Sequence, residues 1–210
     1  MYFIAYLCTA RYYATFFRKA EFCKEIKVAK CRGNQGFTLV ELMITISIIA
    51  IIVTIIAPAI QTKLANMEAK RIQTLIESSL ALAKAESYIR KENVIVCLSN
   101  GEGRCQRDGS KTLLVFIDKN SDNNYDAQID SLIIEQSLNL RYSTLSLRVG
   151  NRRHYTKFWG DSGTPRGHFG HIKYCPTVAY NKSMYLISFN QSGIVKQKLN
   201  ENHPTHCNET

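Results

Sequence analysis

The stretch GFTLVELMITISIIAIIVTIIAPAI occupies residues 36–60. From Leu39 to Ile60 it is predominantly apolar and carries one charge, at Glu41. A helix of about 20 apolar residues crosses the hydrocarbon core of a bilayer and satisfies its own backbone polar groups. The stretch therefore predicts a transmembrane helix. Since a charge in such a segment is unfavourable, Glu41 is either a snorkelling carboxylate at the membrane edge or one that pairs with a positive group supplied at assembly.

The residues Gly36-Phe37-Thr38-Leu39-Val40-Glu41, followed by an apolar helix, resemble the class III signal of type IV pilins and type II secretion pseudopilins. In that family a prepilin peptidase cuts after the glycine, so the resemblance implies cleavage after Gly36 and N-methylation of Phe37. It also implies assembly roles for Glu41, the fifth residue of the mature chain, and for Pro58, which stands where pilins carry a helix-kinking proline. An ordinary signal anchor is the alternative interpretation.

The same resemblance implies the location and partners of the protein. Its partners would be other major and minor pilins or pseudopilins, the prepilin peptidase and the inner membrane. Lys27, Lys30 and Arg32 lie beside the apolar run, and flanking positive charges favour the cytoplasmic side of a membrane. We therefore expect a single-pass inner-membrane protein with a cytoplasmic N-terminus and a periplasmic head, assembled into a pilus or pseudopilus.

Residues 1–36 form the leader peptide that the peptidase would remove. They contain many aromatic residues and three cysteines without a clear period, whereas pilin-like leaders are usually short and basic. Residues 28–36 alone would suffice, so we expect the start codon to be Val28; a genuinely long leader is the alternative. In either case this is a targeting segment and not part of the folded domain.

The net charge of the mature chain is modest. Removing residues 1–36 from the 210 leaves 174, with 20 Lys and Arg against 15 Asp and Glu. The formal charge of +10 for the whole chain is therefore reduced to a mild basic bias, which is not the signature of a dedicated nucleic-acid-binding domain. About 120 residues lie beyond the long helix, which is enough for one globular head.

Beyond Pro58 the pattern becomes that of an amphipathic helix over residues 61–93. Apolar residues recur at helical spacing, as the following set shows: Ile60, Leu64, Met67, Ile72, Leu75, Ile76, Leu82, Ala83, Ala85 and Ile89. Charged residues such as Glu68 lie mostly off this stripe. We expect its C-terminal half to pack on the sheet of the head, and Pro58 to bend or loosen the helix because it removes one backbone hydrogen bond.

From residue 94 the pattern changes to short strands separated by Asn and Gly turns. The expected strands cover residues 94–98, 112–117, 131–135, 145–149, 171–174, 184–189 and 193–196. The predicted fold class is α+β, with a long N-terminal helix packed on a small antiparallel β-sheet head at residues 94–210. The order in which the strands pair does not follow from these patterns.

The head also resembles the GspH/FimT group. The similar features are a strand ending in Cys97, the apolar strand to Phe116 with Asp118-Lys119-Asn120 after it, residues 167–175, and the last strands through Ser192-Gly193. Members of this group are minor pseudopilins near the tip of a secretion pseudopilus, or minor pilins, of which some act in DNA uptake. The resemblance implies a minor pilin or pseudopilin.

The mature chain holds four cysteines, Cys97, Cys105, Cys175 and Cys207, which allow three disulfide connectivities. A bond between Cys97 and Cys105 is favoured because a turn at residues 100–103 can return the chain. A second bond between Cys175 and Cys207, which has weaker support in the sequence, is then possible and would tether the C-terminal tail. Such bonds persist in an oxidising periplasm.

The residues Asp118 to Asp126 place oxygen-bearing side chains at alternate positions, as a Ca²⁺-binding loop does. However, Asn123 stands where glycine is expected and Ile129 where a bidentate glutamate is expected, so a polar hairpin loop is the favoured interpretation. Two groups have spacings loosely compatible with zinc, namely His168, His171 and Cys175, and His203, His206 and Cys207. Because disulfides are expected instead, we predict no metal and no cofactor. No catalytic motif is present, which argues against an enzyme.

A basic cluster is the last candidate site. It comprises Arg148, Arg152, Arg153, Lys157 and Arg166, with Tyr155, Phe158 and Trp159 nearby for stacking on bases. DNA-binding FimT-type proteins share a C-terminal Gly-Arg-x-Arg, and the matching stretch here begins at Gly193. Ile194 and Lys196 replace the two arginines, and Lys198 follows. Since lysine lacks the bidentate fork of arginine, DNA binding in natural transformation is the alternative to a purely structural role.

Overall fold

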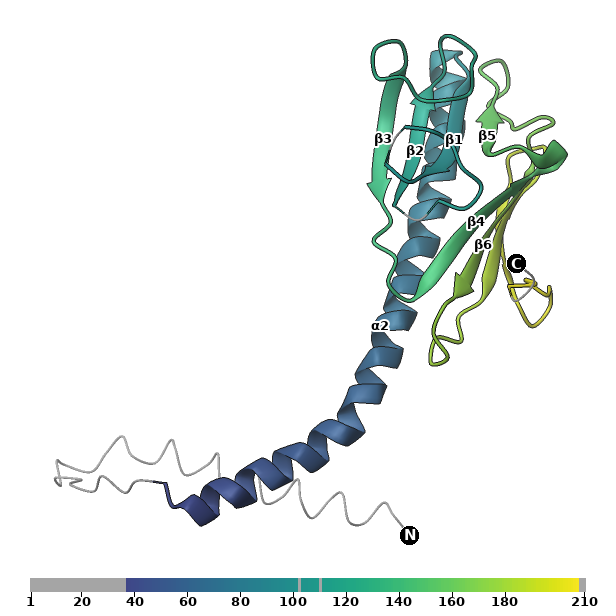
Figure 1. Cartoon of the computed structure of the whole chain (residues 1–210). Coiled ribbons are helices and arrows are strands. Elements are labelled where there is room, and N and C mark those ends of the chain that lie inside the picture. The colour runs from purple at the N-terminus through teal and green to yellow at the C-terminus, as the bar shows by residue number, and fades with distance from the viewer. Residues whose placement is uncertain (1–36, 102, 110, 208–210) are drawn as a thin grey trace, which may run out of the picture. The chain divides into compact units, whose positions relative to one another are not determined.

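The computed structural model describes residues 37–101, 103–109 and 111–207 (Figure 1). The predicted leader 1–36, with the predicted cleavage residue Gly36, lies outside the described residues. The chain divides into two compact units, Met1–Ile49 and Ala50–Thr210. All the strands belong to the second unit.

One helix, α2 (Leu39–Arg90, 52 residues), contains both predicted helical segments. Thr38 caps its N-terminus, since the Thr38 hydroxyl accepts a hydrogen bond from the Glu41 backbone N–H at 3.2 Å. Its C-terminus is followed by Lys91 in a left-handed conformation, with φ of 60°. Pro58 lies inside the helix, which continues on both sides of it.

Among the described residues, α2 is the one helix long and apolar enough to cross a membrane by length and composition. Its apolar window is not buried within the chain. The hydroxyl groups there do not compromise this apolarity, because they donate to the helix's own carbonyls: Thr45 to Leu42 at 2.8 Å, Ser47 to Met43 at 2.7 Å and Thr54 to Ile51 at 2.7 Å.

The buried face of α2 differs from the predicted stripe. The residues that are buried run along one face: Ala65, Glu68, Ala69, Ile72, Ile76, Ser79, Leu80, Ala83 and Ser87. Ile72, Ile76 and Ala83 were predicted correctly, whereas Ile60, Leu64, Met67, Ala85 and Ile89 are exposed. The face that meets the sheets uses several Ala and Ser residues, which allow close approach. A stripe chosen by large apolar side chains therefore had the wrong position around the helix.

Glu68 was predicted to lie off the apolar stripe, but it is buried and joins α2 to the head. Its carboxylate accepts hydrogen bonds from the backbone N–H groups of Arg141 at 2.7 Å and Tyr142 at 3.2 Å. It also accepts from the Ser143 hydroxyl at 2.6 Å and the Tyr174 hydroxyl at 3.3 Å. A buried carboxylate with this many donors is satisfied, so Glu68 holds the segment that leads into β4 (Ser143–Val149) against the helix.

The head contains two four-stranded sheets in which every pairing is antiparallel. The N-terminal sheet has the order β3-β2-β1-β5 and consists of β1 (Val94–Ser99), β2 (Thr112–Ile117), β3 (Ser131–Ser137) and β5 (Tyr155–Phe158). The C-terminal sheet has the order β4-β6-β7-β8 and consists of β4 (Ser143–Val149), β6 (Gly170–Pro176), β7 (Tyr185–Phe189) and β8 (Val195–Leu199). A short 3-10 helix, η2 (Gly150–Arg152), follows β4.

The predicted fold class is confirmed, but the head has one strand, β5, that was not predicted. β5 lies in the stretch that we interpreted as a basic loop with stacking aromatics. It pairs with β1, so the chain leaves the C-terminal sheet after β4, completes the N-terminal sheet and returns at β6. Tyr155, Thr156 and Phe158 are residue types that favour strands, but β5 is only four residues long and lies among basic residues, so the stretch was interpreted as a loop.

The main core lies between α2 and the inner faces of both sheets. It includes Ile76, Leu80, Val96, Val115 and Tyr174. A second, smaller cluster lies on the outer face of the N-terminal sheet and contains Ile95, Cys97, Leu114 and Phe116, with Cys105, Tyr125 and Tyr155 packed against it. β1 is consequently buried on both faces.

Candidate functional site

The first candidate site is the predicted start of the mature chain, at Phe37. Phe37 is 72% exposed and Glu41 lies in the first turn of α2. Thr38 and Glu41 have the Ser/Thr-x-x-Glu spacing of a capping box, and the structure shows the threonine half of it. A threonine three residues before Glu41 predicts this helix cap from sequence alone, and the prediction was not made.

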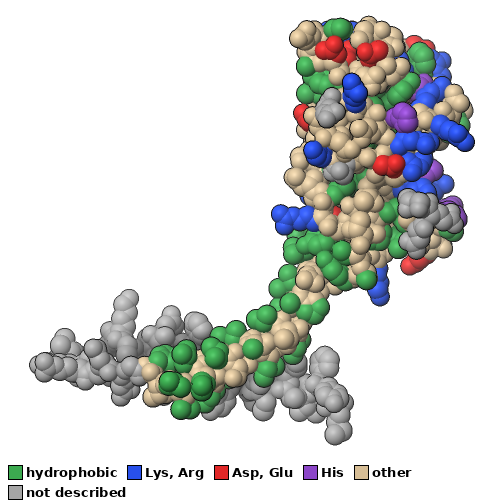
Figure 2. Space-filling view, viewed as in Figure 1, with side chains coloured by type: hydrophobic (Ala, Val, Ile, Leu, Met, Phe, Trp, Pro, Cys, Tyr) green, Lys and Arg blue, Asp and Glu red, His purple; other side chains and the backbone are tan. Residues whose placement is uncertain are grey.

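The apolar residues of α2 between residues 39 and 64 form the second element of this site. The large apolar side chains from Leu39 to Ile56 are exposed, and so are those of Ile60 and Leu64. Figure 2 shows green side chains along this part of the helix and blue ones gathered on the head. So much exposed apolar surface on one element is typical of a membrane or protein contact.

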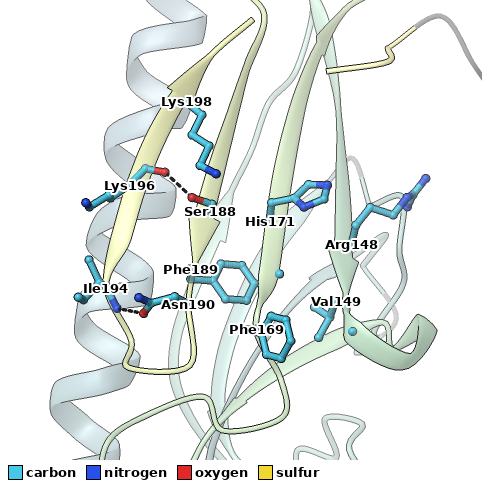
Figure 3. A pocket seen from close by; sticks show the side chains of 12 residues that line it. Arg148, Val149, Phe169, His171, Ser188, Phe189, Asn190, Ile194, Lys196 and Lys198 are labelled. Carbon is cyan, nitrogen blue, oxygen red and sulfur yellow. Dashed lines mark hydrogen bonds between the residues drawn. The ribbon is translucent and has the colours of Figure 1, made fainter. Parts of the chain in front are cut away.

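The second candidate site is an open groove of about 750 Å³ on the outer face of the C-terminal sheet (Figure 3). Strand register places residues distant in sequence side by side there. Arg148 pairs with His171, His171 with Ser188, and Ser188 with Lys196, so these four form a row across four strands. The neighbouring row consists of Ser146, Lys173, Leu186 and Lys198.

This groove is electropositive. Burial lowers the pKa of His171, and the nearby charges of Lys173, Arg148 and Lys198 lower it further, so His171 is held neutral by its basic surroundings. Arg148 forms an ion pair with Asp108 at 3.1 Å. Within the described part of the chain, no carboxylate pairs with Lys196 or Lys198.

The rim of the groove adds apolar surface. Phe169 and Ile194 line it and are 43% and 50% exposed. Gly170 lets β6 approach β4 closely at this point, since a Cβ on Gly170 would lie 2.1 Å from the Arg148 carbonyl oxygen. The turn before β8 is held by Asn190, whose side-chain oxygen accepts from the Ile194 N–H at 2.9 Å.

The structure divides the predicted DNA-binding residues into two groups. Arg148, Lys196 and Lys198 line the groove together. Arg152 and Arg153 lie in the connection from β4 to β5 and do not line it; Arg153 instead donates to the Gly167 carbonyl at 2.5 Å. In the wider basic cluster, Lys157 is buried in β5 and Arg166 forms an ion pair with Asp161.

The predicted stacking aromatics occupy packed positions, with Phe158 buried and Tyr155 and Trp159 partly exposed. Phe158 is fully buried in the main core. Tyr155 packs on His168 with ring centroids 5.4 Å apart, and the Trp159 indole N–H donates to the Arg166 carbonyl at 3.0 Å. These side chains were assigned to a loop, whereas β5 and its continuation place them in packed positions. Phe169 is the aromatic residue that the groove exposes.

Both expected disulfides are present, Cys97–Cys105 and Cys175–Cys207. They consume the cysteines of the two candidate zinc groups. Among the described residues, the one group of three or more metal-ligand side chains is Asp118, Asp122 and Asp130, in the loop after β2.

Comparison with known proteins identifies the N-terminal segment. Residues 31–57 match the prokaryotic N-terminal methylation motif. No curated protein matches the chain.

Among solved structures, the type IV minor pilin FimU of Pseudomonas aeruginosa is similar at 13% identity, with a TM-score of 0.49 over 70% of this chain and 97% of FimU. The minor pseudopilin EpsH from the Type 2 Secretion System of Vibrio cholerae is similar at 13% identity, with a TM-score of 0.46 over 63% of this chain and 97% of EpsH.

The methylation motif lies at the start of the long apolar helix, and an antiparallel β-head follows this helix, as expected for a type IV pilin-like protein. The motif coincides with the segment from which the sequence predicted this class.

Proposed function

We propose that the protein is a minor pilin or pseudopilin, a structural and assembly subunit rather than an enzyme. The methylation motif at residues 31–57, followed by a helix whose apolar side chains are exposed, is the observation that carries this proposal. The helix first anchors the subunit in the inner membrane, with the head on the periplasmic side. Its apolar surface is then covered by neighbouring helices in the filament.

Processing supplies the charge that assembly needs. Cleavage after Gly36 creates an α-amino group on Phe37, and an amine of pKa about 8 is mostly protonated at neutral pH. Glu41 is four residues away, within the first turn of α2. In a low-dielectric bundle, an unpaired Glu41 carboxylate is costly and attraction to a positive charge is strong. A subunit that offers its Phe37 amine to the Glu41 of a neighbour therefore sets the axial register of docking.

Mass spectrometry of the purified protein tests the processing step. We expect an N-terminus at Phe37 that carries a methyl group. Gly36→Leu should leave the leader attached, because the peptidase pocket must accept a residue with little or no side chain. An intact leader in the parent protein, or cleavage after another residue, contradicts the proposal.

Crosslinking to partner pilins tests the role of Glu41. Glu41→Val should leave membrane insertion intact, because it only increases apolarity, yet reduce docking into the filament at least about tenfold, the effect of 1.4 kcal/mol. Glu41→Asp should be intermediate because its side chain is shorter. Thr45→Val is the matched control, since it also makes the helix more apolar but removes no charge. Normal assembly of Glu41→Val would rule out the pairing mechanism.

A second candidate function is DNA binding by the groove of the C-terminal sheet. The observation in its favour is the row of Arg148, His171, Ser188 and Lys196 beside Lys173 and Lys198. Lysine ammonium groups hold phosphates as point charges, without the bidentate geometry of arginine. Such a surface would bind the backbone of duplex DNA without sequence preference.

Salt-dependent binding of the mature protein to duplex DNA tests this candidate. The double variant Lys196→Ala/Lys198→Ala should weaken binding and flatten the dependence of affinity on salt by about two phosphate contacts. Lys111→Ala/Lys182→Ala removes two exposed lysines outside the groove and serves as the control. If the parent shows no salt-dependent binding at low ionic strength, or if both double variants behave alike, only the structural role remains.

A further inference from the structure

The loop between β2 and β3 gathers three carboxylates. Asp118 directly follows β2, Asp130 directly precedes β3, and Asp122 lies between them. One oxygen from each lies within 4.8 Å of one from each of the others. Asp118 and Asp130 are buried and Asp122 is exposed, so the group is open to solvent on one side.

Asp118 has an ion-pair partner but no hydrogen-bond donor among the described residues. Its side chain is completely buried, and neither of its carboxylate oxygens accepts a hydrogen bond from any described residue. The Lys157 ammonium lies 3.6 Å from one of these oxygens, beyond hydrogen-bond distance, and is 3.5 Å from the Asn123 side-chain oxygen. Burying a carboxylate without hydrogen-bond donors is costly, so a cation that coordinated Asp118 directly would stabilise it more than the distant ammonium of Lys157 does.

The other two carboxylates are held in place by the loop backbone. The oxygens of Asp130 accept from the N–H groups of Lys119 at 3.0 Å and Asp126 at 2.8 Å. One oxygen of Asp122 accepts from the Asn124 N–H at 2.8 Å. A carboxylate oxygen has a second lone pair after one such bond, so these groups are oriented and can still bind a cation.

We propose that Asp118, Asp122 and Asp130 form a Ca²⁺-binding site. The site presents oxygen atoms and no His or Cys, as hard cations require, and a flexible loop suits Ca²⁺ better than the strict octahedron of Mg²⁺. The structure accounts for both departures from the Ca²⁺-loop pattern. Asn123, which replaces glycine, adopts the left-handed conformation with φ of 64°. The carboxylate missing at Ile129 is provided one residue later by Asp130.

The site has a consequence for the N-terminal sheet. The loop that carries it also places Tyr125 against Phe116, with ring centroids 5.4 Å apart, over the outer face of the sheet. Bound Ca²⁺ would fasten this loop at the base, where β2 ends and β3 begins. Lys157 and Ca²⁺ would compete for Asp118, because both are attracted to the same carboxylate.

Thermal unfolding and calorimetric titration of the mature protein with CaCl₂ test the proposal, with MgCl₂ and ionic-strength-matched NaCl as comparisons. We expect Ca²⁺ to raise Tm, with a dissociation constant of about 0.1–1 mM, and Mg²⁺ to act more weakly. Asp122→Asn should reduce Ca²⁺ affinity at least about tenfold while leaving the metal-free Tm unchanged, because Asp122 is exposed. Asp108→Asn, an exposed aspartate elsewhere, is the matched control.

Lys157→Met separates a metal site from a structural ion pair. It should lower the metal-free Tm, because Asp118 loses its nearest cation, and increase the rise in Tm that Ca²⁺ produces. A lower Tm without any greater response to Ca²⁺ would assign Asp118 to an ion pair only and overturn the proposal. So would the absence of a Ca²⁺-specific shift in the parent, or an unchanged affinity in Asp122→Asn.

Discussion

The two sheets of the head differ in what covers their outer faces. On the N-terminal sheet, the outward-facing side chains of Ile95, Leu114 and Phe116 are buried beneath the loop that follows β2. On the C-terminal sheet, the corresponding central positions hold Lys173 and Leu186, which are only partly buried and border the basic groove. Both sheets have four antiparallel strands, so strand number and pairing do not account for this difference.

The outer face of the N-terminal sheet is part of the packed interior, whereas the outer face of the C-terminal sheet is accessible to a ligand. A sheet packed on both faces contributes stability and presents little outer surface for binding. A sheet packed on one face leaves alternate residues free to vary, and here they gather positive charge. We therefore expect substitutions on the outer face of the N-terminal sheet to affect folding, and equivalent substitutions on the C-terminal sheet to affect binding.

Introducing a charge at matched outer positions should produce the largest contrast. Leu114→Lys places an ammonium group in a buried apolar cluster and should lower the free energy of unfolding by more than about 4 kcal/mol. Leu186→Lys places the same group on the open face beside other lysines, and should cost less than about 1 kcal/mol. Urea denaturation of the mature protein in detergent measures both. Equal costs would show that the two outer faces are equally covered.

Removing an aromatic ring from each face should give a smaller contrast in the same direction. Phe116→Ala removes a fully buried ring and should cost about 3–5 kcal/mol. Phe169→Ala removes a half-exposed ring at the groove and should cost about 1 kcal/mol. The same denaturation experiment tests this pair, and a cost at Phe169 as large as that at Phe116 would indicate that the groove is closed in solution.

Two histidines, His168 and His171, should give the smallest contrast, which is a difference in how strongly each makes stability depend on pH. Burial lowers the pKa of His168 to about 4, and the charges of Arg153 and Lys157 contribute. The unfolded chain then binds more protons than the folded one below pH 6.5, so stability is full above that pH and is lost as pH falls toward about 4. His171, whose pKa is also lowered, contributes in the same direction.

Denaturation of histidine variants at pH 7 and pH 4.5 measures these contributions. His168→Gln should remove more of the acid-induced loss of stability than His171→Gln, because His168 packs between Tyr155 and Trp159 whereas His171 lines the open groove. An equal reduction in both variants would contradict the difference in burial between the two faces.

The sequence predicted most of the helices and strands, but fewer of the contacts between them. The apolar run of residues 112–117 and the alternating residues 145–149 were both predicted as strands, and the structure shows β2 buried on both faces and β4 buried on alternate residues. β5 was missed because its four residues are too short a run to show a period, and its partner β1 lies about 60 residues earlier in the sequence. The burial of Glu68 was missed because its donors lie more than 70 residues away in sequence.

The sequence by itself determined the long apolar helix and its processing motif, because a contiguous run carries all the information about length, polarity and cleavage signal. It also determined the strands whose periodicity is strong, since periodicity is a local property. Only the tertiary structure decided which charges share a surface. Arg148 and Lys196 come together because strand order and register join four separate segments, whereas Arg152, next to Arg148 in the basic stretch, is turned away by the chain's passage to β5. The burial of Asp118 without a hydrogen-bond donor among the described residues likewise arises only in the folded chain, because packing, and not composition, removes water from a carboxylate.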